Sequence, residues 1–241
     1  MPRFYCSEPL AIGATIALPD AVAHHVFVLR MQPGDPLCLF DGGGGEYRAT
    51  LASSDKRRAT AVVDSHDARE VELPWQVTLV QALPEGSKMD WIIEKAVELG
   101  VTAIQPLAAK RCVVKLSAER AGKKQDHWQA VIVAASEQSG RNRLAKLGEL
   151  TDFERWMGSE DMSSCILLTP RAIESLADWT RATPPRTISL MIGPEGGYTQ
   201  QEEDAAIARG AIALSMGPRI LRTEAAGLAA LAAINAAWGG M

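Results

Sequence analysis

Two glycine-proline turns near the carboxyl end of the sequence carry the residues best suited to chemistry. Gly193-Pro194-Glu195-Gly196-Gly197 follows the apolar residues 188–192, and Gly217-Pro218-Arg219 follows a second apolar run, residues 211–216. Glycine backbone between apolar walls suits a flat, neutral-to-polar ligand such as an adenine ring, held by backbone hydrogen bonds. Glycines that serve only the positive φ of a tight turn are the alternative. Charged side chains that could orient a second substrate lie in or beside these turns: Glu195, Arg219, Arg222 and Glu224.

Several kinds of chemistry lack their motifs in this sequence. There is no GxGxxG after the first strand of the α/β part, and no P-loop, HExxH or GxSxG motif. The four cysteines have no metal-binding spacing, so we expect free thiols in a reducing cytoplasm and no metal. No apolar run approaches the ~18–20 residues of a membrane span. We therefore expect a cytoplasmic protein without a membrane partner or an export signal.

The segments around the turns alternate between strands and helices. Thr199 and Glu202 have the spacing of a capping box, which predicts a helix after the first turn. Strands are expected at residues 77–82, 101–107 and 165–168, and helices at 87–99 and 117–140. This alternation predicts a parallel sheet with helices on both faces. The last helix, Thr223–Trp238, is Ala- and Leu-rich around most of its circumference, so it packs either in its own core or against a second copy of the chain.

The first 68 residues have a different pattern, that of a small β-rich module. One helix, with Asp20 as the expected N-cap, interrupts short strands. The polar residues 64–74 are the best linker candidate, and we place the domain boundary near residue 72. The strands are expected at residues 4–5, 14–17, 37–40, 47–51 and 59–63.

Charge is distributed unevenly along the chain. The net charge is −4, yet residues 110–146 contain nine Lys or Arg against three Asp or Glu. Such a basic segment is typical of a phosphate-contacting face, and a solvated helix surface is the equal alternative.

The two turns and several further blocks resemble one known family. Residues 192–197 (IGPEGG) and 214–225 (LSMGPRILRTEA) are similar to the C-terminal signature of the ribosomal RNA small-subunit methyltransferase E family, in the SPOUT superfamily of RNA methyltransferases. The resemblance extends over essentially the whole chain. Other matching pieces are His25 with Val28-Leu29-Arg30-Met31, Phe40-Asp41-Gly42, Lys88-Met89, Glu94-Lys95, Glu98-Leu99-Gly100-Val101, Arg111-Cys112 and Glu137–Asn142.

The resemblance implies an α/β fold class, a function and partners. Residues 1–72 would form a PUA-like RNA-binding β-barrel, and residues 73–241 a SPOUT α/β domain with a deep trefoil knot. General topology rules disfavour knots, so only the resemblance predicts one. The family acts as a homodimer that uses S-adenosyl-L-methionine to methylate uridine N3 in the 16S rRNA of the small ribosomal subunit. A SPOUT methyltransferase acting on another RNA, such as tRNA, and a non-catalytic RNA-binding protein with this fold are the competing hypotheses.

The resemblance also assigns residues to roles. Arg222 would stabilise charge on the uridine, and Glu224 or Glu195 would act as the base. The predicted cofactor residues are Leu168, Thr169, Ile192, Gly193, Gly196, Met216, Gly217, Leu221 and Thr223. The predicted RNA contacts are Arg3, Arg30, Lys56, Arg57, Arg58, Arg111 and Arg141.

Overall fold

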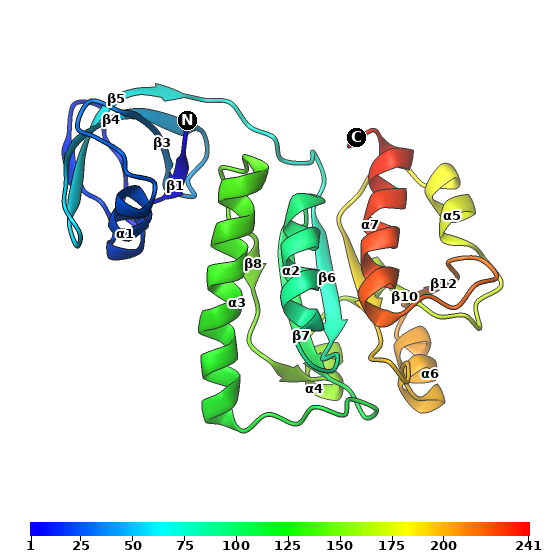
Figure 1. Cartoon of the computed structure of the whole chain (residues 1–241). Coiled ribbons are helices and arrows are strands. Elements are labelled where there is room, and N and C mark those ends of the chain that lie inside the picture. The colour runs from blue at the N-terminus through cyan, green and yellow to red at the C-terminus, as the bar shows by residue number, and fades with distance from the viewer. The chain divides into compact units, whose positions relative to one another are not determined.

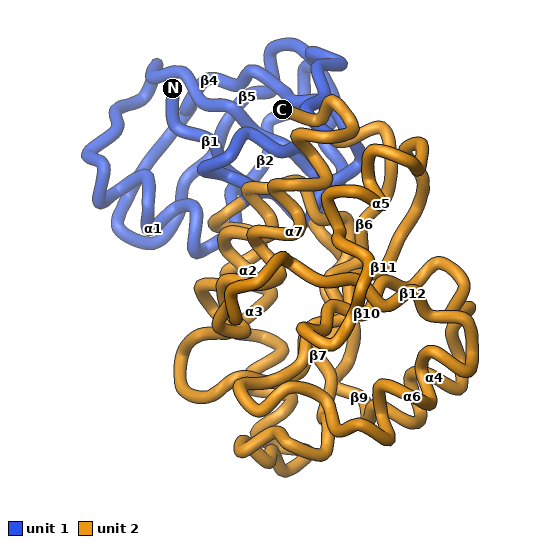
Figure 2. Tube along the Cα trace, turned by 90° about the vertical axis from the view of Figure 1, so that its right-hand side faces the viewer, with its two compact units in different colours: residues 1–72, 136–144 blue, residues 73–135, 145–241 orange.

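The computed structural model describes residues 1–241, and the chain divides into two compact units. The first unit contains residues 1–72 together with residues 136–144. The second contains residues 73–135 and 145–241. Figure 2 colours the two units separately. Each has its own sheet, as the change of pattern along the sequence predicted.

The first unit is built on a five-stranded sheet in the order β1-β3-β4-β5-β2. β1 pairs with β3 in parallel, and the other pairs are antiparallel. One helix, α1, packs its buried residues Val22, Ala23 and Val26 into the same core as Phe4 and Leu39. The elements are β1 (Arg3–Tyr5), β2 (Thr15–Ala17), α1 (Asp20–Val28), β3 (Pro36–Phe40), β4 (Glu46–Ser54) and β5 (Ala59–Asp67).

Two local predictions for this unit are wrong. Pro19, not Asp20, occupies the N-cap of α1, and Asp20 is the first helical residue. At this position the Asp20 carboxylate lies near the positive end of the helix dipole. This electrostatic interaction favours an acidic residue there, although its side chain makes no capping hydrogen bond. The expected linker also begins too early, because β5 continues to Asp67 and pairs it with Glu46. Polar side chains at residues 64–67 therefore belong to a solvent-facing strand end.

The second unit contains a seven-stranded sheet whose pairs are all parallel, as predicted. Its order is β12-β10-β11-β6-β7-β8, with β9 also paired to β7 (Figure 1). The central strands are almost continuously buried, which is typical of a sheet covered on both faces. The strands are β6 (Val77–Ala82), β7 (Ala103–Ala108), β8 (Lys146–Leu147), β9 (Thr151–Asp152), β10 (Cys165–Leu168), β11 (Ile188–Ile192) and β12 (Ile212–Leu214).

Helices cover this sheet on both sides, also as predicted. In Figure 2, α2, α3 and α7 lie on one side of the strands, and α4 and α6 lie on the other. The capping box of Thr199 and Glu202 opens α6, and the last helix has the predicted bounds. The short α4, α5 and one 3-10 turn were not predicted. The helices are α2 (Lys88–Glu98), α3 (Ala118–Ser139), α4 (Phe153–Ser159), α5 (Leu176–Ala182), α6 (Gln200–Ala208) and α7 (Thr223–Trp238), and the 3-10 turn is Met162–Ser164.

Two further expectations concerned free thiols at the cysteines and the lack of an apolar run long enough to span a membrane. All four cysteines are buried and unpaired, and burial raises the pKa of the Cys6 and Cys165 thiols to about 11. These thiols are therefore core side chains rather than nucleophiles. Among the helices, none combines the length and apolar character needed to cross a membrane.

Candidate active site

The carboxyl ends of β10, β11 and β12 open into one cavity. β10 lies between the other two strands, so residues 168–171, 192–198 and 216–224 meet at the same edge of the sheet. The cavity has a volume of about 690 Å³, within the range of small-molecule sites. All nine predicted cofactor residues line it, as do Arg222, Glu224 and Glu195. The two glycine-proline turns, which are separate in the sequence, thus line the same cavity.

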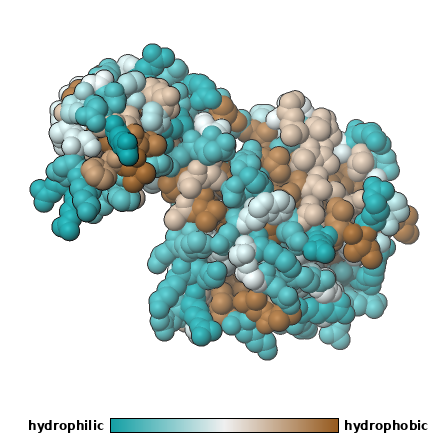
Figure 3. Space-filling model, viewed as in Figure 1, coloured by the Kyte–Doolittle hydropathy of each residue, from teal (hydrophilic) through white to brown (hydrophobic).

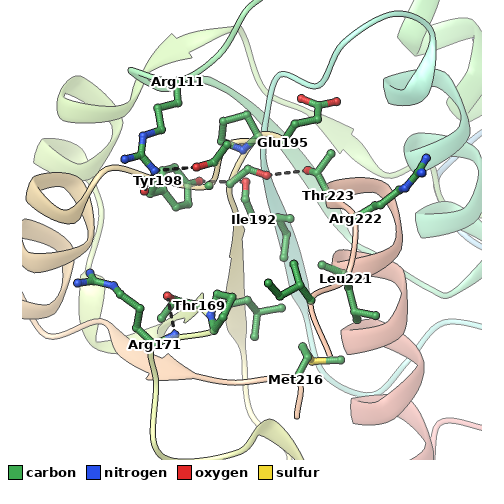
Figure 4. Close-up of a pocket in the computed structure, with 18 of the residues that line it drawn as sticks. Arg111, Thr169, Arg171, Ile192, Glu195, Tyr198, Met216, Leu221, Arg222 and Thr223 are labelled. Atoms are coloured by element: carbon green, nitrogen blue, oxygen red, sulfur yellow. Dashed lines mark hydrogen bonds between the residues drawn. The ribbon is translucent and has the colours of Figure 1, made fainter. Parts of the chain in front are cut away.

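Apolar side chains and unpaired backbone surround this space. Figure 4 shows Ile192, Met216 and Leu221 around the space that Thr169 also borders. None of the backbone N–H groups of residues 216–222 donates to another group of the protein. Unpaired backbone donors beside apolar walls match the requirements of a flat heteroaromatic ligand.

Glycine is required at two points of the cavity wall. A Cβ on Gly193 would lie 2.8 Å from the backbone nitrogen of Tyr198, too close for any side chain. Gly217 has a φ of +87°, in the left-handed region that favours glycine. Close packing at one turn and backbone conformation at the other explain both glycines without any ligand. The evidence for a ligand-binding site is therefore the cavity between the two turns, not the glycines themselves.

A buried hydrogen-bond chain joins the first turn to the start of α7. The Thr223 hydroxyl donates to the Gly193 carbonyl at 2.6 Å, and the Gln81 amide donates to Thr223 Oγ1 at 3.0 Å. Gln81 is fully buried at the end of β6, and its Oε1 has no hydrogen-bond partner. Sequence reasoning missed Gln81, because a lone glutamine in a strand gives no motif.

Glu195 is held in an ion pair at the rim of the cavity. Its Oε1 accepts from Lys88 Nζ at 2.5 Å and from the Glu85 N–H at 3.0 Å. Burial raises the pKa of the Glu195 carboxyl, but the bonds from Lys88 and the backbone outweigh this and hold it below its usual range. A carboxylate with a lowered pKa is a weak proton acceptor.

Glu224 and Arg222 have different surroundings. Glu224 Oε2 is buried without a hydrogen-bond partner, in the first turn of α7. Arg222 is exposed, and in Figure 4 its side chain points away from the apolar floor of the cavity. An unpaired carboxylate oxygen is available to accept a proton, and a rim guanidinium is available to an incoming polyanion.

Two further charged residues of the cavity were not predicted. Arg171 Nε donates to Glu203 Oε2 at 2.8 Å, and the Thr169 hydroxyl donates to the same oxygen at 3.1 Å. Glu203 is buried in the first turn of α6, next to the capping residue Glu202. The sequence shows Glu203 only as a helix-start acid, so its second role could not be read from the pattern.

Two of the predicted RNA contacts, Arg3 and Arg141, form internal pairs within the first unit. Arg3 pairs with Glu46 at 2.5 Å, hydrogen-bonds Asn142 and lies over the Phe40 ring. Arg141 is buried and forms a two-bond pair with Glu72. Guanidinium groups engaged in such pairs are less available to phosphates.

The other predicted RNA contacts lie at the surface. Arg30, Lys56, Arg57 and Arg58 are exposed in the first unit. Arg111 is exposed beside the cavity, where its guanidinium donates to the Gly196 and Tyr198 carbonyls at 2.8 and 3.3 Å. Arg30 also has a φ of 56°, unusual for a residue with a side chain.

The amino-acid sequence matches two protein-family models, one in each part of the chain. Residues 71–235 match the model described as an RNA methyltransferase domain, and residues 18–64 match that of an RNA methyltransferase PUA domain. These matches define the class: a two-part RNA methyltransferase with a mixed α/β fold. This is the class that the resemblance to a known family predicted.

Comparison with individual relatives identifies the family within this class. The ribosomal RNA small subunit methyltransferase E of Bacillus subtilis is 33% identical, with 98% of this chain and 96% of the relative covered. That of Synechocystis is 38% identical, with 97% and 77% covered. A crystal structure of the Neisseria gonorrhoeae enzyme, bound to S-adenosyl methionine, is 40% identical with a TM-score of 0.93, covering 99% and 98% of the two chains. This chain belongs to the ribosomal RNA small subunit methyltransferase E family.

Proposed function

We propose that this chain transfers the methyl group of S-adenosylmethionine to N3 of a uridine in the 16S rRNA of the small ribosomal subunit. The observation that carries the proposal is the single cavity at the ends of β10, β11 and β12, lined by every predicted cofactor residue. The high similarity to the cofactor-bound Neisseria structure supports it.

The residues of the cavity fit this cofactor. Leu168, Ile192, Met216 and Leu221 would enclose the adenosine, and the unpaired N–H groups of residues 216–222 would donate to its ring and ribose. Thr169, Gly193, Gly196, Gly217 and Thr223 would complete the walls. When bound, the cofactor supplies an electrophilic methyl group.

We assign the base to Glu224. Uridine N3 carries a proton and becomes a good nucleophile only when that proton is lost. The buried, unpartnered Oε2 of Glu224 favours this residue over Glu195, which is engaged with Lys88. Arg222 would stabilise the negative charge that develops on the uracil oxygens, and Glu195 would hold the turn after β11 in place.

The finer architecture of the family is part of the same proposal. We infer a trefoil knot in the segment from β10 to α7, supported by β10 lying between β11 and β12 and by the Ser175–Ser215 bridge beyond it. We also infer a homodimer, supported by the exposed Ala236 and Ala237 of α7 and by the pale apolar strip over α7 in Figure 3. Sedimentation of the purified protein would test the dimer.

RNA recognition would be shared by both parts of the chain. We propose residues 1–72 as a PUA-like RNA-binding domain, with Arg30 and the Lys56–Arg58 turn as phosphate contacts. Residues 73–241 form the proposed methyltransferase domain, where Arg111 lies beside the cavity. Because its substrate is the small ribosomal subunit, the protein would act in the cytoplasm.

The decisive experiment measures methyl incorporation from labelled S-adenosylmethionine. Small ribosomal subunits from cells lacking the protein, naked 16S rRNA and tRNA would be compared as substrates. The proposal expects label at uridine N3 in 16S rRNA. Incorporation only into tRNA would favour the other SPOUT activity, and no incorporation into any RNA would favour a non-catalytic RNA-binding protein.

A further inference from the structure

A second cavity, which the methyl-transfer site does not use, opens at the same edge of the parallel sheet. It has a volume of about 790 Å³ and lies at the ends of β6, β7 and β9, between the loop before α3 and the start of α4. Its lining includes Leu83, Val114, Leu116 and Phe153 as apolar surface. A cavity of this size accommodates a nucleotide.

Only one layer of residues separates this cavity from the methyl-transfer site. Neighbouring residues line opposite cavities in two places: Arg111 lines the first and Lys110 the second, and Glu203 lines the first and Glu202 the second. In a third place the rings of Tyr198 and Phe153 are in contact, with centroids 5.1 Å apart, and Tyr198 lines the first cavity while Phe153 lines the second.

This dividing wall is fixed by hydrogen bonds. The Lys110 N–H donates to Glu202 Oε1 at 2.9 Å, while Glu202 Oε2 accepts from the Thr199 backbone at 2.7 Å. On the other side, Arg111 donates to the Gly196 and Tyr198 carbonyls. The two cavities therefore keep a fixed spacing across a thin partition.

Two cations at the second cavity are available to a polyanion. Residues 110–124, some of which line the cavity, contain six Lys or Arg and a single acid, Glu119. Three acids also line the cavity: Glu202 is occupied by the bonds above, Glu154 pairs with Lys110, and Asp152 is exposed. Lys115 and Arg155 line the cavity, are exposed and form no ion pair.

We propose that the second cavity binds a nucleotide that flanks the target uridine on the same RNA strand. The base would contact the apolar lining, and Lys115 and Arg155 would contact its phosphates. Single strands are bound in this way, by apolar or aromatic contacts to bases and by cations along the backbone. The inference rests on the proposed function, since it assumes that the first cavity receives the uridine.

The test compares binding of uridine monophosphate and of oligouridylates of two to five nucleotides. In the wild type we expect the longer ligands to bind about tenfold more tightly than the monophosphate, the gain typical of one further base contact. Ala121→Phe, which fills the cavity from α3, and Lys115→Glu should each remove this gain. Lys123→Glu is the matched control, with the same charge change in α3, eight residues further along the chain and outside the cavity lining.

Cofactor affinity, measured by calorimetry, separates this inference from the proposed function and from misfolding. Wild-type cofactor affinity in Ala121→Phe and Lys115→Glu, together with loss of the length-dependent gain, would support the site. Unchanged oligouridylate binding in these variants would overturn it. A raised KM for small subunits with unchanged oligouridylate binding would also overturn it, in favour of a ribosomal-protein contact.

Discussion

The Lys88 ammonium lies 2.5 Å from the Glu195 carboxylate, and this contact joins the start of α2 to the turn after β11. The Glu85 N–H donates to the same carboxylate oxygen, so the turn is attached to the β6–α2 connection at two points. The hydrogen bond to Glu195 raises the pKa of Lys88, which keeps the pair ionised at neutral pH. We therefore propose a positioning role for Glu195, which leaves Glu224 as the carboxylate for proton transfer.

Glu224→Gln and Glu195→Gln are expected to differ in kcat. Loss of a general base costs about 10²–10⁴ in rate, so Glu224→Gln should reduce kcat by that factor with little change in cofactor affinity. Glu195→Gln keeps an acceptor for the Glu85 N–H, so its kcat should stay within about fivefold of wild type. Single-turnover methylation measures both, and the opposite ranking would return the base to Glu195.

Arg222→Ala should lose methyl transfer while cofactor affinity stays near wild type. The guanidinium points away from the apolar floor of the cavity, so it is not placed to hold the adenosine. Calorimetry with the cofactor, next to a methylation assay, distinguishes the two roles. Loss of cofactor binding would place Arg222 in the pocket instead. Arg209→Ala, at an exposed position outside the cavity lining, is the control.

Thr223→Val should destabilise the second unit and weaken cofactor binding. The hydroxyl links Gln81 to the Gly193 carbonyl, and its removal leaves a buried amide N–H and a carbonyl without a partner. The expected cost is about 1–3 kcal/mol in the free energy of unfolding, measured by urea titration. Thr223→Ser retains the hydroxyl and should behave as wild type. A Val variant as stable as wild type would contradict this account.

Substitutions at Arg141 and in the Lys56–Arg58 turn should distinguish a structural arginine from residues that bind RNA. Breaking the buried pair with Glu72 should cost about 3–5 kcal/mol of stability without changing the salt dependence of RNA binding. Replacing Lys56, Arg57 and Arg58 by glutamine should reduce the slope of log K against log salt by about one for each phosphate that the turn no longer binds, at unchanged stability. A reduced slope for Arg141→Ala would restore it as an RNA contact.

Glu137→Gln should stabilise the first unit at neutral pH. Burial raises the pKa of Glu137, against the opposing Tyr5 N–H bond of 2.9 Å, so the folded state binds this proton more tightly than the unfolded state does. Stability therefore falls as the pH rises through the folded-state pKa. The variant keeps the acceptor for Tyr5 and should melt higher at pH 7, with the difference vanishing near about pH 4. Thermal scans across pH test this, with the exposed Glu8→Gln as control.

The sequence predicted the parts of the fold that local signals specify. The capping box at Thr199 and Glu202, the strand residues 188–192 and the bounds of α7 were all correct. The short α4 and the two-residue β8 and β9 were missed, because elements of this length have too few residues for a periodic pattern.

The candidate site was predictable where backbone and motif define it, and not where tertiary partners do. Gly193 and Gly217 stood out because turns require glycine there. Arg3 and Arg141 were assigned to RNA because the sequence does not reveal that Glu46 and Glu72 neutralise them. Gln81 could not be predicted, because its role depends on a hydrogen bond to Thr223, which lies 142 positions away in the sequence.

The position of β6 between β7 and β11 has a consequence for biosynthesis. Residues 77–82 emerge from the ribosome early, yet their partner on one side, residues 188–192, is made more than a hundred residues later. The second glycine-proline turn and the Thr223 hydroxyl, which complete the methyl-transfer cavity, come later still. A nascent chain thus carries an unpaired apolar strand edge while more than a hundred further residues are made, and it can acquire cofactor only after α7 has been released.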